Sequence, residues 1–227
     1  MRIFFISKMA TFSSRSDRGR WLGRWPHALC ALAALALVAA PSSFAAANID
    51  PSQAKSMITD LTQQAITILK TEKGDLDQRE NKFRTILTKY FAMQSISQTV
   101  AGQHWREMSP KQQAEFQKLF SEWVLKTYSR RFGGYEGENI SVDDASAVGR
   151  GSILVHTTVS GASRNNKVAW RVRQDGKESN KIVDVSVDGV SMLVTQRSEI
   201  ASIVKNKGVE GMLETLRDHV QKADASH

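Results

Sequence analysis

ILVHTTVSGASRNNKVAWRVRQDGKESNKIVDVSV, residues 153–187, alternates apolar and polar side chains in three runs separated by polar, glycine-containing segments. A period of two is typical of β-strands that bury one face. The dipeptide Asp175-Gly176 falls between the second and third runs, where a hairpin turn is expected. A weaker strand is predicted at residues 140–147, and an extended stretch continues at residues 190–194. The sequence thus predicts an antiparallel sheet of about four to five strands.

Apolar residues recur at helical spacing on both sides of this sheet. Capping residues and glycines bound the helical segments, at Asp50-Pro51, Gly74, Asp75, Gly102, Ser109-Pro110, Gly133-Gly134 and Gly208. We expect helices over residues 51–73, 75–91, 93–101, 110–132, 195–205 and 209–220. Helices followed by an antiparallel meander and further helices indicate the α+β class, with the helices packed on one apolar face of the sheet.

Residues 1–47 have the features of a cleavable signal peptide. Four arginines within residues 15–24 precede an apolar run of 13 residues at 28–40, and small residues then allow cleavage after Ala45 or Ala47. A membrane-spanning helix needs roughly 20 apolar residues, so this run is too short to be a typical anchor. With translation starting at Met1 or Met9, we expect a periplasmic protein with a single domain at residues 48–227.

The remaining composition excludes several function classes. Cys30 is the single cysteine and lies in the apolar run, so the mature chain has no disulfide, thiolate nucleophile or Cys-ligated metal. Residues 1–47 hold six Lys/Arg and one Asp, which leaves 25 basic and 22 acidic residues in the mature chain. The high pI of the precursor is therefore largely a signal-peptide effect, and no nucleic-acid partner is expected.

Signatures of catalysis are weak. The mature chain has His104, His156, His219 and His227, and none has metal-ligand spacing. Residues 189–193 lack the second glycine of a nucleophile elbow. Asp143 and Asp144 are adjacent, so in a regular strand their carboxylates point to opposite faces. We expect no catalytic residue, no metal and no cofactor, and hence no enzyme.

Three stretches carry a resemblance to a known family: residues 91–120, the helix that ends near Tyr128, and residues 182–216 with the motif DVSVDGVSML. Together they resemble the MlaC family, also called toluene-tolerance or ABC-transporter auxiliary substrate-binding proteins. Members are periplasmic phospholipid shuttles of the system that maintains outer-membrane lipid asymmetry. The chain departs from the family pattern at Phe91-Ala92, Asn180-Lys181 and Gln196-Arg197. A related branch is associated with hopanoids, so a hopanoid-type cargo stays open.

The resemblance implies a twisted sheet wrapped by N-terminal and C-terminal helices, with an apolar cavity between them for phospholipid acyl chains. It also implies docking to an inner-membrane ABC-transporter complex and an outer-membrane lipoprotein/porin complex. Two acyl chains have about 30 methylenes at roughly 0.8 kcal/mol each, so unassisted transfer through water costs on the order of 20 kcal/mol. A carrier avoids that cost without covalent chemistry.

Strand alternation and helical faces assign the residues expected to line the cavity. These lipid-binding positions are Leu87, Phe91, Val100, Phe120, Val124, Val155, Val168, Trp170, Val172, Val183, Val185 and Val187. Arg171 and Arg173, on the other face of their strand, are interpreted either as a solvated strand edge or as a docking surface for a partner.

Apolar core walls and cavity walls have the same composition, so the sequence leaves two rival functions open. One is a periplasmic adaptor with a solid core and no ligand. The other is a small hydrolase or isomerase, which requires a pocket that holds His156 with a carboxylate within hydrogen-bonding distance.

Overall fold

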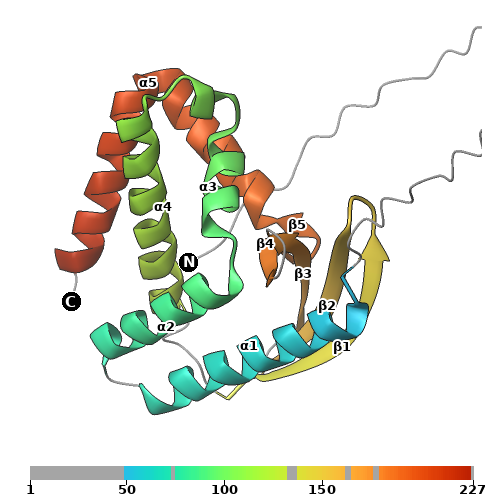
Figure 1. The fold of residues 1–227 in the computed structure, drawn as a ribbon. Helices are drawn as coiled ribbons and strands as arrows, with labels where there is room; N and C mark the ends of the chain where they lie inside the picture. Colours follow the sequence, from blue (N-terminus) through green and yellow to red (C-terminus); the bar gives the residue numbers. More distant parts are fainter. Residues whose placement is uncertain (1–48, 73–74, 132–136, 162–164, 176–178, 226–227) are drawn as a thin grey trace, which may run out of the picture. The chain divides into compact units, whose positions relative to one another are not determined.

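The computed structural model describes residues 49–72, 75–131, 137–161, 165–175 and 179–225 (Figure 1). The predicted signal peptide and the glycines at positions 74, 133, 134 and 176 lie outside these ranges. No helix in the described ranges combines the length and the hydropathy that a membrane span requires.

The described residues form five α-helices and one short 3-10 helix, at α1(Pro51–Thr71), α2(Leu76–Tyr90), α3(Met93–Ala101), η1(Gly102–Arg106), α4(Pro110–Arg131) and α5(Met192–Ala225). The helices α1 to α4 begin close to the predicted positions. Before α1, Asp50 accepts a hydrogen bond from the Ser52 amide at 2.8 Å. Before α4, Ser109 and Gln112 exchange side-chain-to-amide hydrogen bonds of 3.3 and 2.9 Å, which confirms the predicted capping box.

The strands are β1(Asn139–Val148), β2(Ser152–Ser160), β3(Asn165–Asp175), β4(Ser179–Val187) and β5(Val190–Ser191). They pair in sequence order as one antiparallel sheet that is not closed. The α+β fold class is therefore confirmed. In Figure 1, α1 runs along β1 and β2, and both strands contact it.

The transition from β5 to α5 differs from the prediction. The extended stretch stops at Ser191 and the helix begins at Met192, three residues before the predicted start at Thr195. The reason is capping, since Ser191 Oγ accepts a hydrogen bond from the Val194 amide at 3.1 Å. Further along, Gly208 has φ of 69° and separates the two helical segments that the sequence predicted.

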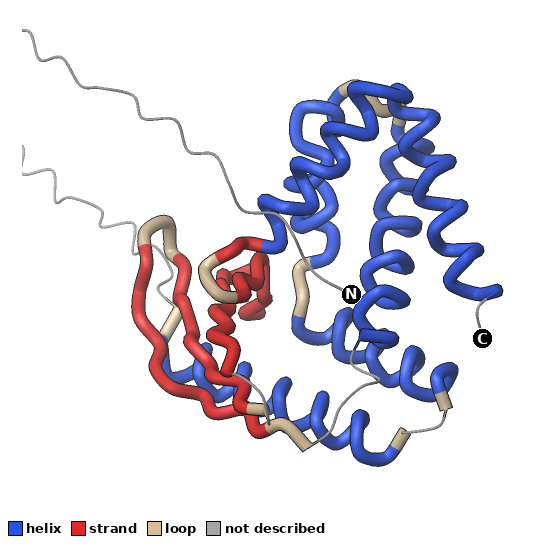
Figure 2. The backbone as a smooth tube through the Cα atoms, turned by 180° about the vertical axis from the view of Figure 1, so that it is seen from behind, coloured by secondary structure: helices blue, strands red, loops and turns tan. Residues whose placement is uncertain are grey.

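Two apolar clusters divide the interior. The sheet-side cluster joins α1 and α2 to the sheet and has these buried members: Ile49, Ala54, Ile58, Leu61, Ile68, Leu69, Phe83, Ile86, Tyr90, Leu125, Ile153, Val155, Val172 and Ile182. The helix cluster joins α3, α4 and α5, which lie together in Figure 2. Its buried members are Val100, Ala101, Met108, Phe116, Phe120, Ile200, Val204, Met212, Leu213 and Leu216.

Candidate functional site

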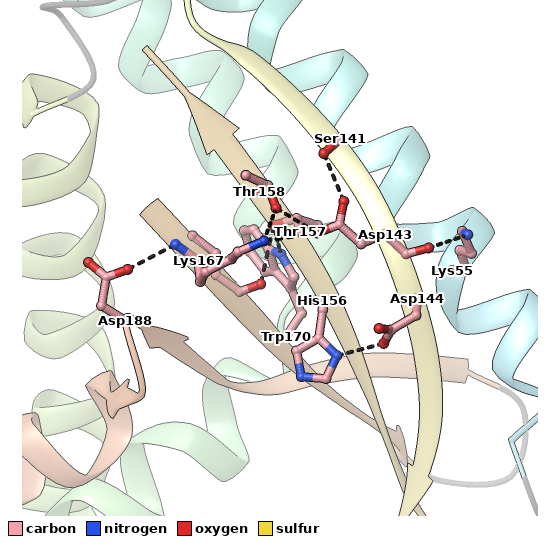
Figure 3. Close-up of polar contacts among 11 residues, drawn as sticks. Lys55, Ser141, Asp143, Asp144, His156, Thr157, Thr158, Lys167, Trp170 and Asp188 are labelled. Carbon is pink, nitrogen blue, oxygen red and sulfur yellow. Dashed lines mark hydrogen bonds and ion pairs between the residues drawn. The ribbon is translucent and has the colours of Figure 1, made fainter. Parts of the chain in front are cut away.

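Six of the predicted lipid-binding residues meet in the sheet-side cluster. Val155 and Val172 are fully buried there, with no exposed surface. The half-buried members pack against them: Leu87, Phe91, Trp170 and Val185. The indole of Trp170 donates a hydrogen bond to Thr157 Oγ1 at 3.1 Å (Figure 3). This group is a packed core in which α1 and α2 cover one face of the sheet.

The other helical positions lie elsewhere. Val100, Phe120 and Val124 belong to the helix cluster, where the Phe120 ring stacks against Phe116 with centroids 5.7 Å apart. Val168 and Val187 pair with each other across β3 and β4 and belong to neither cluster. The twelve predicted positions therefore do not line one cavity in this structure, and their contact with lipid stays a prediction.

Val183 occupies a different face from the one predicted. Arg171 pairs with Asp184 and Val172 pairs with Ile182, so Val183 is the extra residue of a β-bulge. Ile182 takes the buried position opposite Val172. Val183 instead lines a cleft together with Arg171 and Arg173.

This cleft is the candidate site, and its volume is about 630 Å³. It lies between one end of the sheet, the β1–β2 turn, α3 and the first turn of α5. An isolated bridge between Phe91 and Ile182, with the Ala92 amide donating to the Ile182 carbonyl at 3.0 Å, ties the start of α3 to β4. The apolar part of the lining comprises Ile96, Val148, Val183 and Leu193. Such a volume is typical of ligand pockets, which span about 300–1,000 Å³.

The polar lining of the cleft is basic and incompletely paired. Arg150, Arg171 and Arg173 line it, and none of their side chains forms an ion pair or hydrogen bond with another residue in the described ranges. Ser152 is only 2% exposed, and its hydroxyl has no hydrogen-bond partner among the described residues. Buried hydroxyls are normally hydrogen-bonded, so this unpaired one is unusual, but its oxygen has almost no surface that a ligand in the cleft could contact.

The carboxylate in the lining, Asp184, already accepts two hydrogen bonds. It accepts hydrogen bonds from Ser191 Oγ at 2.7 Å and from the Leu193 amide at 3.1 Å. Both contacts hold the first turn of α5, which supplies one wall of the cleft. The negative charge also lies favourably beside the N-terminus of that helix.

Replacing Asp184 with Ala is expected to destabilise the fold by about 1–2 kcal/mol, because it removes a helix-capping acceptor and its charge. For a domain of this size the melting temperature should fall by roughly 2–8 °C. Asp184→Asn is the control, since it keeps an acceptor oxygen and should lose less. Thermal melts by circular dichroism measure the difference. Equal stability of wild type and Asp184→Ala would contradict the capping role.

A second cleft, of about 540 Å³, lies between α1 and α2. Its lining is mostly polar: Asp60, Gln63, Gln64, Thr67, Ile68, Thr71, Lys82, Thr85 and Ile86. Most of these side chains are exposed, and Gln64 donates a hydrogen bond to the Tyr90 hydroxyl at 2.6 Å. Its one lysine, Lys82, is paired with Glu72, whereas the arginines of the cleft at α3 and α5 have no ion-pair partner among the described residues.

The prediction that Asp143 and Asp144 point to opposite faces of β1 is wrong. A register shift between Val142 and Ala145 places both carboxylates on one side (Figure 3). Asp143 accepts hydrogen bonds from Thr158 at 2.6 Å and Ser141 at 2.8 Å. These hydroxyl donors, Thr158 first, hold the pKa of Asp143 below its ordinary value of 3.8.

His156 has a carboxylate partner, because its Nδ1 lies 2.6 Å from Asp144 Oδ1. The two side chains are 41% and 69% exposed, and neither residue lines either of the two clefts. The pairing thus lacks the enclosed pocket that general acid–base catalysis needs to hold a substrate. Among the described residues, no group of three or more His, Cys, Asp or Glu is placed to hold a metal ion.

Sequence reasoning missed most of the cleft lining. Ser95, Ile96 and Thr99 come from α3, and Leu193 from α5. The sequence contained one usable indication, Arg150 between Gly149 and Gly151 in a hairpin turn. Arg150 has φ of 64°, a left-handed conformation that costs a non-glycine residue roughly 1–2 kcal/mol.

Comparison with known proteins adds two findings. The family model described as MlaC protein matches residues 59–218. The fold is similar to the solved structure of a phospholipid-binding protein from Ralstonia solanacearum, determined in complex with a phospholipid. The TM-score is 0.63 at 19% sequence identity, and the match covers 75% of this chain and 98% of that chain.

Proposed function

Because the chain belongs to the MlaC protein family, we propose that it is a periplasmic phospholipid carrier whose ligand enters the cleft between the sheet, α3 and α5. The observation that carries this proposal is the cleft itself. Its apolar residues are suited to methylene groups, and its arginines give the mouth of the cleft a polar surface. The phospholipid-bound neighbour with the same fold supports the same ligand class.

Binding and transport fit the molecule better than catalysis. Moving a lipid requires only that its methylenes leave water, at about 0.8 kcal/mol each, and that the cleft later release them. No bond has to break. The family match favours a binding protein over an enzyme, and so does the exposed position of the His156–Asp144 pair.

The proposed route runs between an outer-membrane lipoprotein/porin complex and an inner-membrane ABC-transporter complex, in keeping with the family. Residues 1–47 would direct export and be removed. The sequence leaves Arg171 and Arg173 either as a solvated strand edge or as a docking surface for a partner, and their place in the cleft lining favours contact with the ligand instead. A hopanoid is a second cargo class, and it would fill the apolar lining without using the arginines.

The test is transfer of labelled phospholipid from donor to acceptor vesicles by protein purified from a periplasmic extract. A carrier should raise the transfer rate in proportion to its concentration, because each molecule moves lipid independently. An adaptor without a ligand should leave the rate at the protein-free value. A transfer rate equal to the protein-free value, both for labelled phospholipid and for a labelled hopanoid, would exclude the carrier function.

A further inference from the structure

We propose that the outer edge of β1 is able to pair with a second copy of this chain, and that a bulge at Asp143 and Asp144, together with Lys55, prevents this pairing. The inference concerns the sheet edge and holds whatever ligand the cleft takes, so it goes beyond the proposed function. It also assigns a structural use to the exposed His156–Asp144 pair, which no enclosed pocket surrounds.

The two edges of the sheet differ. At one edge, β5 pairs with the end of β4, and the Ala92 amide donates a hydrogen bond to the Ile182 carbonyl at 3.0 Å. At the other edge, β1 comes first in the strand order, and no described residue forms a backbone hydrogen bond with its outer side. Unpaired N–H and C=O groups on an edge strand are a template for another strand. The edge of β1 is therefore open to a further strand.

The part of β1 best suited to pairing is the run 145–148, which follows the bulge. Its sequence is Ala-Ser-Ala-Val, and Ser146 and Ala147 are exposed. The run has none of the charged side chains that usually keep edge strands apart. Two copies can pair antiparallel about a two-fold axis, because each then presents the same groups to the other. The run ends at Val148, which lines the cleft, so a paired second copy would lie beside the candidate site.

The bulge interrupts the edge directly before this run. Between the pairs Val142–Thr157 and Ala145–Val155, two residues of β1 stand opposite a single residue of β2. An extra residue of this kind bends its strand, increases the local twist and disrupts the ladder of hydrogen bonds. A regular strand added from outside therefore cannot follow β1 over its whole length.

Lys55 closes the edge at the bulge itself. Its Nζ, from α1, donates a hydrogen bond to the Asp143 carbonyl at 2.7 Å and reaches β1 from the side opposite to β2 (Figure 3). The acceptor that an added strand would use at this point is thus taken, and a positive charge lies on the edge. Lysines and bulges are features by which natural sheets keep edge strands from pairing with other chains.

Side-chain contacts hold the bulge in place. Asp143 accepts hydrogen bonds from Thr158 at 2.6 Å and from Ser141 at 2.8 Å. Asp144 Oδ1 lies 2.6 Å from His156 Nδ1 (Figure 3). Exposed polar strands specify their register weakly, and these contacts keep β1 in the bulged register. The exposed histidine and its carboxylate thus act on the pairing of β1 and not on a substrate.

The experiment removes the bulge and the lysine together and measures the mass of the protein in solution. Deletion of Asp144 leaves one residue opposite His156, and Lys55→Ala frees the Asp143 carbonyl. Mature wild-type protein should stay monomeric at all concentrations in size-exclusion chromatography with light scattering. The double variant should approach twice the monomer mass as its concentration rises. Lys70→Ala, at an exposed lysine in the last turn of α1, is the control and should stay monomeric.

Ala147→Lys, added to the double variant, tests whether the copies meet at the β1 edge. It should restore the monomer, because lysines of the two copies would face each other across the paired strands.

If circular dichroism shows that the deletion does not fold, Lys55→Ala/Thr158→Val decides instead. That variant keeps the chain length, and it loses the lysine contact and one hydrogen bond to Asp143. Its mass should also rise with concentration.

A folded variant without the bulge and the lysine that stays monomeric would overturn the proposal. A dimer that survives Ala147→Lys would overturn it as well, because the copies then meet at another surface. So would a wild-type dimer that Ala147→Lys converts to monomers, since the edge would then pair despite the bulge. None of these results bears on lipid transfer, which the vesicle assay measures separately.

Discussion

Replacing Val183 with Trp should remove most of the lipid that co-purifies with the protein, while the fold is kept. Val183 lines the cleft from the β4 bulge, so an indole there would occupy space that a ligand needs. Excluding about three methylenes, at roughly 0.8 kcal/mol each, corresponds to about 50-fold weaker binding. Lipid extraction and quantification relative to protein measure the effect.

Thr85→Trp is the matched control for this substitution. Thr85 is exposed and lines the second cleft, between α1 and α2, so its indole adds the same bulk at the other hollow. Lipid content should stay at the wild-type level. Loss of lipid in Thr85→Trp with retention in Val183→Trp would move the site to the α1–α2 cleft.

Val172→Asp is expected to prevent folding at neutral pH. Val172 has no exposed surface and packs in the sheet-side cluster among α1, β2 and β4. The substitution loses roughly 1.5–3 kcal/mol of apolar burial and adds about 2–7 kcal/mol for a polar group without a partner. That sum approaches the whole stability of a typical domain, about 5–15 kcal/mol. Soluble yield and the far-ultraviolet circular dichroism spectrum measure the result.

Val172→Ala provides the comparison, because it removes volume without adding charge. A loss of about 2–3 kcal/mol is expected, with a folded protein and a lower melting temperature. A soluble, folded Val172→Asp protein would contradict the packed core described for this face of the sheet. It would show instead that water or ligand reaches Val172.

The elements of this fold follow from local chemistry that the sequence displays. Alternation in residues 153–187 predicted β2, β3 and β4, and the capping residues Asp50 and Ser109 predicted the starts of α1 and α4. These features depend on neighbours in the chain, and for that reason they are visible without a structure.

The bulges were not predictable, and they determine which side chains face which surface. One extra residue in β4 moves Val183 from the core face to the cleft, and the shift in β1 brings Asp143 and Asp144 to one side. A bulge depends on the pairing of two strands, so no pattern within a single strand reveals it.

The packing partners of the helices could not be predicted from the sequence either. The same helix, α4, gives Leu125 to the sheet-side cluster and Phe120 to the helix cluster. Helical periodicity shows that both residues are buried, yet it cannot tell which neighbour each one meets. The cleft could therefore be found only from the structure, because its lining is drawn from α3, α5, four strands and the β1–β2 turn.

Native mass spectrometry of the protein, purified from a periplasmic extract without detergent, tests the central claim most directly. The account predicts a complex with about one phospholipid per chain, and lipid extraction would then identify that lipid. A mass equal to that of the lipid-free chain, with no lipid taken up from vesicles afterwards, would contradict the carrier function and favour an adaptor that works through protein contacts alone.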